Sequence, residues 1–332
     1  MKIIAVTNIK GGVGKTTTAV NLAYLCAASG RATLLWDLDA QAASTHILRG
    51  QSHGSVAARK LVSGKREPSE VLCHTAYPHL DLLPADFSYR NLDLHLSERK
   101  HPTERLLKMS RSLRETYAAL FLDCPPGFSL LSENVLRAAD ALVVPLLPAP
   151  LSLRMLEQLR AFLDTHGWRD LLLVPFFSMV DRRRSLHREV IQASRMRFPG
   201  LLATEVPYWS EIERMSEQRA PLPALSPRSV ATAIYVRLWR EIEQRIGPIL
   251  QPTAAPTEDE VSAGEPSALE VDALEAGAVA AGMLDPGAEA GLLSAELVMS
   301  APLSDLLPDL ESLDTTPPGA DHTEPGADDR DD

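Results

Sequence analysis

Short apolar runs alternate with segments of helical spacing along the first 250 residues. The apolar runs expected to form strands are 3–6, 32–36, 80–83, 118–122, 141–146 and 171–177. Helical spacing marks the segment from a glycine-rich turn through residue 25 and the segments 103–115, 130–139, 151–166, 186–198 and 230–246. Apolar strands separated by amphipathic helices favour a parallel sheet that is covered on both faces. With right-handed crossovers, this pattern predicts a doubly wound, mostly parallel α/β fold.

The fold class also predicts where chemistry should lie. In doubly wound sheets, ligands bind at the carboxyl ends of the strands. The strands that end at Val6, Trp36 and Leu122 are each followed at once by polar residues or glycines. We therefore expect the functional residues directly after these three positions.

Charge divides the chain into two parts. Residues 251–332 contain 20 Asp and Glu and one Arg, a net charge of −19, whereas residues 1–250 contain 32 Lys and Arg and 24 Asp and Glu, a net charge of +8. The acidic part has no Phe, Trp, Tyr or Lys, so it lacks the apolar surface that offsets ordering entropy. We expect one domain over residues 1–248 and a disordered acidic tail over residues 249–332.

The tail allows three interpretations. Leucines between residues 299 and 313 have a spacing that suits a short helix on a partner protein. The tail is equally compatible with an inert solubilising segment. A third hypothesis is that its negative charge screens the basic body and competes with DNA.

The cysteines and the absence of a long apolar run indicate the compartment. Cys26, Cys73 and Cys124 are well separated and form no Cys-x-x-Cys motif, which argues against a disulfide framework and against a zinc or iron–sulfur site. No apolar run approaches the ~18 residues of a membrane span. The N-terminus has a strand pattern in place of a signal peptide. We expect a cytoplasmic protein.

A glycine-rich loop follows the first strand and begins the first helix. Its residues are Lys10, Gly11, Gly12, Val13, Gly14, Lys15, Thr16 and Thr17. In this context, backbone N–H groups and the helix N-terminus bind phosphate oxygens. Lys15 is expected to reach the β- and γ-phosphates, and the Thr16 hydroxyl to coordinate Mg²⁺. The competing interpretation, a glycine turn without a ligand, fits this strand–loop–helix context poorly.

The loop departs from the strict phosphate-loop pattern at two positions. Ile9 stands where that pattern has a glycine, and Lys10 supplies a second lysine. In this form the sequence resembles the ParA/MinD family of ATPases. The resemblance implies ATP and Mg²⁺ as ligands, a homodimer in the ATP state, and a Lys10 that reaches the partner's nucleotide. A cation supplied in trans stabilises phosphate charge in the way an arginine finger does.

Two further segments resemble family motifs that carry carboxylates. The run 34–41 is similar to the second motif, which implies that Asp39 orients or activates the attacking water and that Asp37 lies near the Mg²⁺ shell or the switch region. Trp36, Ala40 and the pair 42–43 depart from the usual residues there. The alternative is a solvated pair of acids at a strand end.

The strand 118–122 is followed by Asp123, as in a Walker B strand. Asp123 is expected to accept a hydrogen bond from a Mg²⁺-bound water. Pro125 and Pro126 end the strand and stiffen the turn that follows.

Two later segments resemble the loops that flank adenine in this family. The segment 178–182 follows the strand 171–177, and Val206 and Pro207 follow further along the chain. The resemblance implies nucleotide contacts at Met179 and Pro207, made largely by the backbone.

Arginines are abundant in the second half of the body. Solvated helix faces are the plain interpretation. The basic body and the family resemblance favour ATP-dependent, non-specific DNA binding through phosphates, which weakens with salt. The candidate residues are Arg182, Arg188, Arg195, Arg197, Arg214, Arg219, Arg237 and Arg240. The resemblance further implies association with the nucleoid and a ParB-like protein or other cargo adaptor that stimulates slow hydrolysis.

Other members of the superfamily remain as alternatives. A MinD-like membrane ATPase needs a basic amphipathic C-terminal helix, whereas this C-terminus is acidic. A related metabolic enzyme, such as an amide ligase of cofactor synthesis, uses a similar phosphate loop. Lys10 and the arginine-rich second half favour the dimeric switch over that enzyme.

Overall fold

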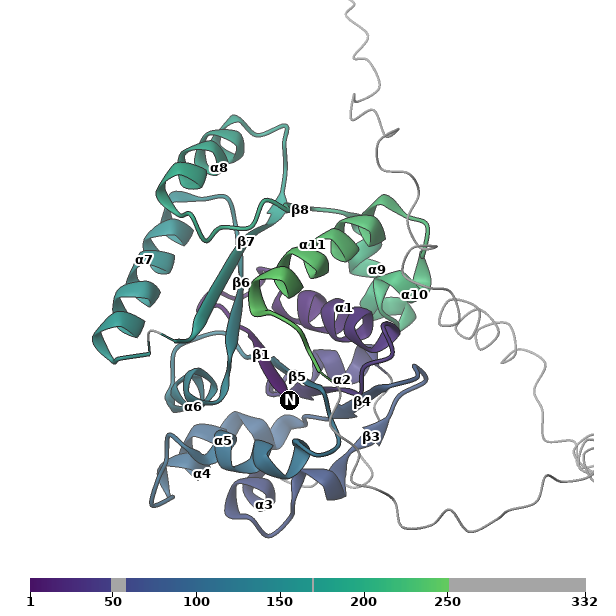
Figure 1. Ribbon diagram of the computed structural model, residues 1–332, viewed down its shortest axis with the longest axis vertical. Coiled ribbons are helices and arrows are strands. Elements are labelled where there is room, and N and C mark those ends of the chain that lie inside the picture. Colours follow the sequence, from purple (N-terminus) through teal and green to yellow (C-terminus); the bar gives the residue numbers. More distant parts are fainter. Residues whose placement is uncertain (49–57, 169, 251–332) are drawn as a thin grey trace, which may run out of the picture.

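The computed structural model describes residues 1–48, 58–168 and 170–250 (Figure 1). All of the helices and strands given below lie within these ranges. The acidic tail predicted over residues 249–332 lies outside the described residues from position 251 onward, so its expected disorder stays a prediction.

An eight-stranded sheet forms the centre of the described part. Its order is β3-β4-β2-β5-β1-β6-β7-β8, and β3 alone is antiparallel to its neighbour. The strands are β1 (Lys2–Val6), β2 (Thr33–Asp37), β3 (Cys73–His74), β4 (Leu80–Leu83), β5 (Ala119–Asp123), β6 (Ala141–Leu146), β7 (Leu172–Val180) and β8 (Val206–Pro207). The mostly parallel, doubly wound sheet predicted from the sequence is confirmed. The two missed strands, β3 and β8, are edge strands of two residues, too short to leave a hydrophobic pattern.

Helices and 3₁₀ turns connect the strands. The helices are α1 (Lys15–Ala28), α2 (Ala43–Ile47), α3 (Ala58–Ser63), α4 (Leu92–Ser97), α5 (Arg105–Ser110), α6 (Leu130–Ala138), α7 (Pro150–Thr165), α8 (Ser185–Arg197), α9 (Ser210–Gln218), α10 (Leu222–Leu225) and α11 (Val230–Ile246). The 3₁₀ turns are η1 (Pro68–Val71), η2 (Phe87–Asn91) and η3 (Arg111–Leu113).

The helix expected over residues 103–115 is shorter than predicted. It consists of α5 followed by η3. Asn134 explains the late start, because its side chain donates to the Pro102 carbonyl and accepts from the Leu106 amide. These bonds satisfy the chain just before α5 and the free amide of its first turn.

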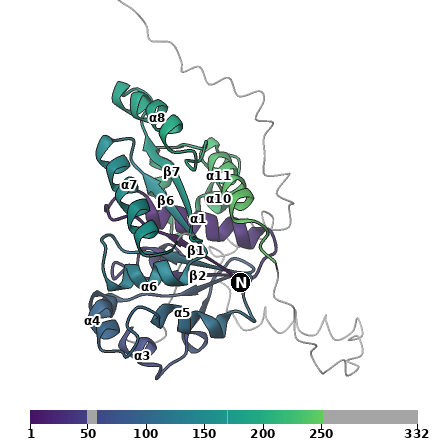
Figure 2. The same cartoon turned by 60° about the vertical axis from the view of Figure 1, so that its left-hand side comes forward.

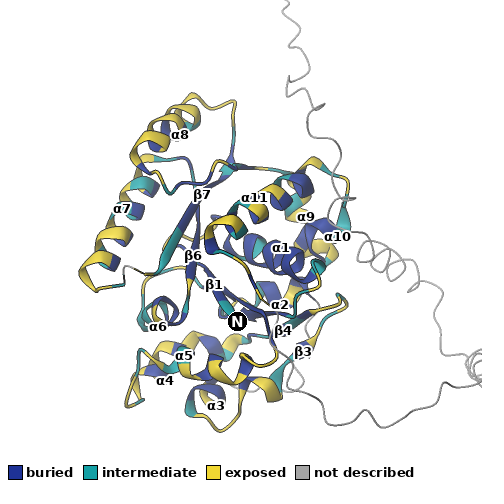
Figure 3. Cartoon of the chain, viewed as in Figure 1, coloured by how far each residue is buried: buried dark blue, intermediate teal, exposed yellow. Residues whose placement is uncertain are grey.

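Alternate residues of each strand pack into two separate cores. Ile3 and Ala5 of β1 lie in one core with α3 to α8, whereas Ile4 and Val6 lie in the other with α1, α2 and α9 to α11. Figure 2 shows the sheet between these two helical layers. Helix α1 is buried along most of its length (Figure 3). This two-sided burial explains why the strands are apolar throughout.

The sheet order brings the three expected chemical segments together. Strand β1 pairs with β5, and β5 pairs with β2, so the residue pairs Val6–Asp123 and Asp37–Asp123 are in register. The glycine-rich loop and both acidic segments therefore start at one edge. No helix in the described ranges has both the length and the apolar composition needed to cross a bilayer.

Candidate functional site

The glycine-rich loop wraps around the N-terminus of α1. Gly12 and Gly14 have φ values of 69° and 87°, in the left-handed region that glycine adopts without strain. A Cβ atom at Gly14 would also lie 3.1 Å from Ser178 Oγ. The loop is held by Asn8, which accepts from the Lys10 amide at 2.9 Å and donates to the Pro145 carbonyl at 2.7 Å. Asn8 was not predicted as a site residue. Its position between the first strand and the glycine-rich loop could have indicated a role in holding the loop.

The two lysines of the loop have opposite environments. Lys15 is buried, and its Nζ donates to the Lys10 carbonyl oxygen at 3.0 Å. Burial lowers the pKa of Lys15, and the negative charges of Asp123 and Asp39 oppose that shift. The Lys10 side chain is exposed. The loop therefore presents one ammonium group inward and the other outward.

Asp123 is the buried carboxylate with free hydrogen-bonding capacity. Its Oδ2 accepts from Ser44 Oγ at 2.7 Å, while its Oδ1 has no hydrogen-bond partner among the described residues. Burial raises the pKa of Asp123, the nearby charge of Asp37 raises it further, and the Ser44 and Thr16 hydroxyls oppose the shift. A buried, unpartnered carboxylate oxygen beside a threonine hydroxyl fits a hydrated Mg²⁺. The structure thus brings Thr16 and Asp123 together, and their role in binding Mg²⁺ stays a prediction.

The protein supplies few direct metal ligands. Within residues 1–48, 58–168 and 170–250, no group of three or more His, Cys, Asp or Glu is arranged to hold a metal ion. This donor set suits Mg²⁺, which keeps several waters and shares its remaining positions with substrate phosphates.

Asp37 is committed to bonds within the protein. Its Oδ2 accepts from the Thr45 amide at 2.9 Å and the Thr45 hydroxyl at 2.8 Å, and its Oδ1 accepts from the Asp39 amide at 3.1 Å. Burial is the main cause that raises its pKa, and the Thr45 bonds oppose the rise. These contacts make Asp37 the residue that positions the Asp39 segment. Its place near the Mg²⁺ shell stays a prediction.

Asp39 lies at the mouth of the site. Its side chain is half-buried and accepts from the Gln41 amide at 2.9 Å. Its charge acts on both Lys15 and Asp123, since it influences their pKa values. The structure therefore brings Asp39 to the phosphate loop, where a water-orienting residue is expected.

The five-residue helix α2 links the carboxylates, and the sequence pattern did not reveal it. Its Ser44 and Thr45 supply the bonds to Asp123 and Asp37 described above. The sequence did contain an indication of these bonds, because two hydroxyl residues, Ser44 and Thr45, closely follow the acidic end of β2. On its outer side, His46 Nε2 donates to the Ser216 carbonyl at 3.0 Å, and Arg219 Nε donates to the His46 carbonyl at 3.0 Å. Helix α2 therefore connects the acidic pair to α9.

A large cavity extends from the glycine-rich loop toward α8 and α11. Its volume is about 1090 Å³, and its lining includes Gly12, Met179 and Pro207. Met179 has a φ of 55° at the end of β7, and β8 pairs beside it. The residues expected near adenine therefore line one cavity with the loop, next to Tyr208 and Trp209.

The candidate DNA-binding arginines do not form one cluster. Arg182 and Arg195 share Glu205 at 3.4 and 2.8 Å, and Arg197 pairs with Glu157. Arg188 donates to the Arg182 carbonyl. Arg219 is directed to α2, as described above. Exposed positions on α9 and α11 hold Arg214, Arg237 and Arg240, and the cavity lining includes Arg182 and Arg237. The surface thus has a group around α8 and a separate set on α9 and α11.

The sequence is similar to a known domain family and to chromosome-partitioning proteins. A family model described as an AAA domain matches residues 1–167. The sporulation initiation inhibitor protein Soj of Bacillus subtilis is 29% identical over 248 residues, which cover 73% of this chain and 98% of that protein. The chromosome-partitioning ATPase Soj of Treponema pallidum is 30% identical over 254 residues, which cover 74% and 98%.

A solved structure extends the comparison to a nucleotide complex. Cobyrinic acid a,c-diamide synthase from Mycobacterium smegmatis, with bound ATP analog and magnesium, has a TM-score of 0.62 and 25% sequence identity. The similarity covers 76% of this chain and 98% of that one.

The buried carboxylate pair predicts a pH-dependent stability. Because folding raises the pKa values of Asp37 and Asp123, the folded state retains protons that the unfolded state releases. The free energy of unfolding without ligand should therefore fall as pH rises from about 4 toward about 8. Asp123→Asn should remove part of this loss and stabilise the ligand-free protein by about 1–3 kcal/mol at pH 8. Urea unfolding at several pH values measures both effects.

The same Asp123→Asn variant should gain less thermal stability from Mg²⁺ and ATP than the parent. Asp39→Asn is the control, since it removes a half-buried charge and leaves both buried carboxylates in place, so the ligand-free protein should still lose stability as pH rises. An Asp123→Asn protein with the parental pH profile would contradict this electrostatic account.

A second prediction concerns Ala42, which precedes α2. Its φ of 52° lies in the left-handed region, where a Cβ atom is strained. Ala42→Gly should therefore raise the free energy of unfolding by up to about 1 kcal/mol. Ala43→Gly, at the first position of α2, should lower it instead. Equal signs for the two variants in urea titrations would contradict this interpretation.

Proposed function

Because the chain belongs to the ParA/MinD family of P-loop ATPases, we propose that it is an ATP-dependent switch for partition or cargo positioning. It is a ParA-like ATPase whose ligands are ATP and Mg²⁺. In the proposed cycle, ATP binding forms a sandwich dimer, and the dimer binds DNA without sequence specificity. Partner-stimulated hydrolysis then releases the DNA. The expected rate without a partner is low.

The observation that carries this proposal is the pair of lysines on the phosphate loop. Lys15 points inward against the loop's own carbonyl, whereas Lys10 lies exposed. An exposed cation beside a phosphate site is available to a second subunit. Bound phosphates then supply the attraction that joins the subunits, which ties dimer formation to the presence of ATP.

The residues of the site divide the chemistry among themselves. The backbone N–H groups of the glycine-rich loop and Lys15 would hold the phosphates. Thr16 would hold Mg²⁺ directly and Asp123 through a water, and the ion would supply positive charge that offsets the charge of the phosphates. Asp39 orients the attacking water, and Asp37 fixes Asp39 through its backbone amide. Met179 and Pro207 lie along the part of the cavity assigned to adenine.

Arginines of the second half supply the proposed DNA contacts. Arg237 and Arg240 on α11 and Arg214 on α9 are exposed. Contacts of this kind address phosphates, so they give affinity that depends on salt and carries little sequence information. A nucleoid-bound dimer is the expected cellular form, and a ParB-like protein or other cargo adaptor is the expected stimulating partner.

One observation supports the alternative of an amide ligase, which is the structural similarity to a diamide synthase. An amide ligase consumes ATP in proportion to the amide that it forms, whereas a switch releases phosphate without an acceptor. ATP hydrolysis in the absence of any amine donor, stimulated by DNA or a protein partner, separates the two functions.

The two lysines should give different defects. Lys15→Ala should weaken ATP binding by about a hundredfold, because a buried phosphate contact is lost. Lys10→Ala should retain ATP binding and lose the ATP-dependent dimer. A fluorescent ATP analogue measures binding, and light scattering measures mass. A Lys10→Ala protein that still dimerises with ATP would rule out the role in trans.

DNA binding should depend on the nucleotide state. Asp39→Ala should hold the protein with ATP bound, so this variant should bind a non-specific duplex with ATP and not with ADP or without nucleotide. Binding should weaken about tenfold or more between 50 and 200 mM salt if several phosphates are contacted. Fluorescence anisotropy of a labelled duplex measures the affinity. Equal affinity in all nucleotide states would contradict the switch.

A further inference from the structure

The segment that ends the folded body is basic, and the segment that follows it is strongly acidic. Residues 182–250 contain 12 arginines, 7 glutamates and no lysine or aspartate, a net charge of +5. Residues 251–332 carry a net charge of −19. The two charges are adjacent along one chain, so the acidic segment is covalently attached to the basic one.

Several glutamates of the basic segment are already committed to bonds within the body. Glu205 accepts from both Arg182 and Arg195. Glu241 accepts from the amides of Ala203 and Thr204 at 2.6 and 2.9 Å. Glu243 forms an ion pair with Arg31 outside the segment. These carboxylates are therefore less available to neutralise the remaining arginines.

Five exposed arginines of residues 182–250 form neither an ion pair nor a side-chain hydrogen bond among the described residues: Arg184, Arg214, Arg228, Arg237 and Arg240. We call three of them, Arg184, Arg237 and Arg240, the arginine rim. Arg184 is the residue directly before α8, and both Arg184 and Arg237 line the same cavity. Arg240 lies three residues beyond Arg237 on α11, which places both on one side of the helix. The arginine rim therefore borders the cavity from two elements.

The acidic segment begins close to the arginine rim. Helix α11 carries two of the rim arginines and ends at Ile246, and the described chain ends at Leu250. Along the helix, Arg237 lies about 14 Å from Ile246. The 82 residues that follow have a contour of about 270 Å, so chain length does not restrict their reach. Attachment also gives them a high effective concentration at the rim.

We propose that residues 251–332 bind the arginine rim as an internal polyanion and compete there with external polyanions. This contact limits access to α8 and α11. The identity of the main competitor, duplex DNA, rests on the proposed function. The contact between the acidic segment and the rim does not.

The magnitudes favour a contact that DNA can displace. Exposed ion pairs contribute only ~0.2–1 kcal/mol each and are screened by salt. Duplex DNA carries one charge per about 1.7 Å, whereas the acidic segment carries 20 acidic residues among 82. The denser polyanion therefore replaces the weaker one once other contacts, such as those of an ATP dimer, add to its affinity. The acidic segment sets a threshold for DNA binding and does not block it completely.

The direct test uses the body and the acidic segment as separate molecules. Residues 1–250 contain the complete sheet and both cores, so this part folds without the rest. A labelled peptide of residues 251–332 should bind it at low salt and lose about tenfold in affinity between 50 and 200 mM salt. The body variant Arg184→Ala/Arg237→Ala/Arg240→Ala should bind the peptide about tenfold more weakly.

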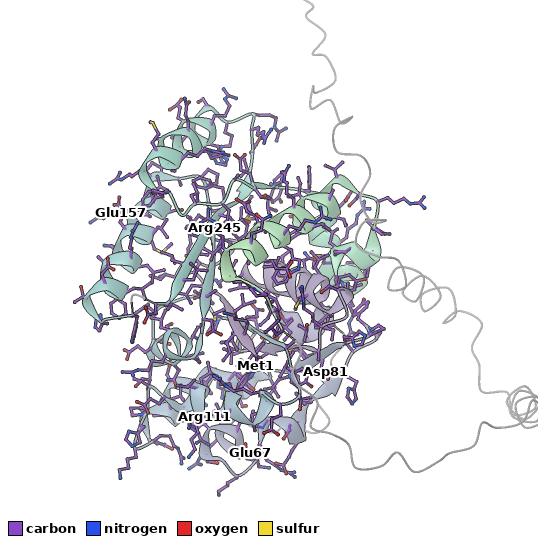
Figure 4. The ribbon with its side chains drawn as sticks, in the orientation of Figure 1. Met1, Glu67, Asp81, Arg111, Glu157 and Arg245 are labelled. Carbon is purple, nitrogen blue, oxygen red and sulfur yellow. The ribbon has the colours of Figure 1, made fainter. Side chains whose placement is uncertain are left out.

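The matched control is Arg90→Ala/Arg111→Ala/Arg114→Ala, which removes three exposed arginines from another part of the chain. Figure 4 shows Arg111 well separated from Arg245 of α11. This control should bind the peptide nearly as well as the parent. No binding at low salt, or an equal loss in the rim and control variants, would overturn the proposal.

A second arm uses the full chain with labelled duplex DNA. Replacing the 20 tail acids by Asn and Gln should increase DNA affinity, whereas a scrambled tail of unchanged charge should not. If the neutral tail leaves a measurable DNA affinity unchanged, competition at the rim is refuted. If neither protein binds DNA in any nucleotide state, the proposed DNA switch fails, and the peptide measurement alone decides the contact.

Discussion

The nucleotide site depends on the burial of two carboxylates that face each other across neighbouring strands. Asp37 ends β2, Asp123 ends β5, and the two are in register. Protein groups compensate them unequally, because Asp37 has a hydrogen bond at each oxygen whereas Asp123 keeps one oxygen without a partner. Two negative charges at this depth are unfavourable without a cation. The two buried carboxylates therefore favour binding of a metal cation, and they lie next to the glycine-rich loop that is expected to bind phosphates.

Helix α2 connects the two carboxylates to the outer part of the molecule. One side of it holds both carboxylates through Ser44 and Thr45, and the other side is bound to α9 through His46. Helix α1 makes a parallel connection, since Asn21 contacts Met215 of α9 and accepts from the Leu222 amide of α10. The elements that begin at the phosphate loop and at Asp39 thus converge on one corner of the molecule. Both elements therefore make direct hydrogen bonds with the C-terminal helices.

The sequence predicted the sheet and the loop well because both have local signals. Continuous apolar runs mark strands buried on two faces, and the spacing of glycines and lysines marks the loop. Ser44 escaped prediction because its partner, Asp123, lies 79 residues away. Helix α2 has only five residues, too few to show a period. The pairing of arginines also depends on tertiary structure, since Arg182 and Arg195 both form ion pairs with Glu205, which lies further along the chain.

The position of β1 in the sheet has a consequence for the order in which the molecule is made. This strand leads directly into the phosphate loop, yet it is the fifth strand of the sheet, between β5 and β6. Its first residue pairs with Ala119, and Ile4 pairs with Ala141. A chain that emerges from the ribosome N-terminus first therefore exposes β1 with both edges open until more than a hundred further residues have followed. During that interval the strand is open to incorrect pairing, and the phosphate loop has no support from Pro145. Strand β1 and the phosphate loop therefore gain their neighbours only after most of the domain has been synthesised.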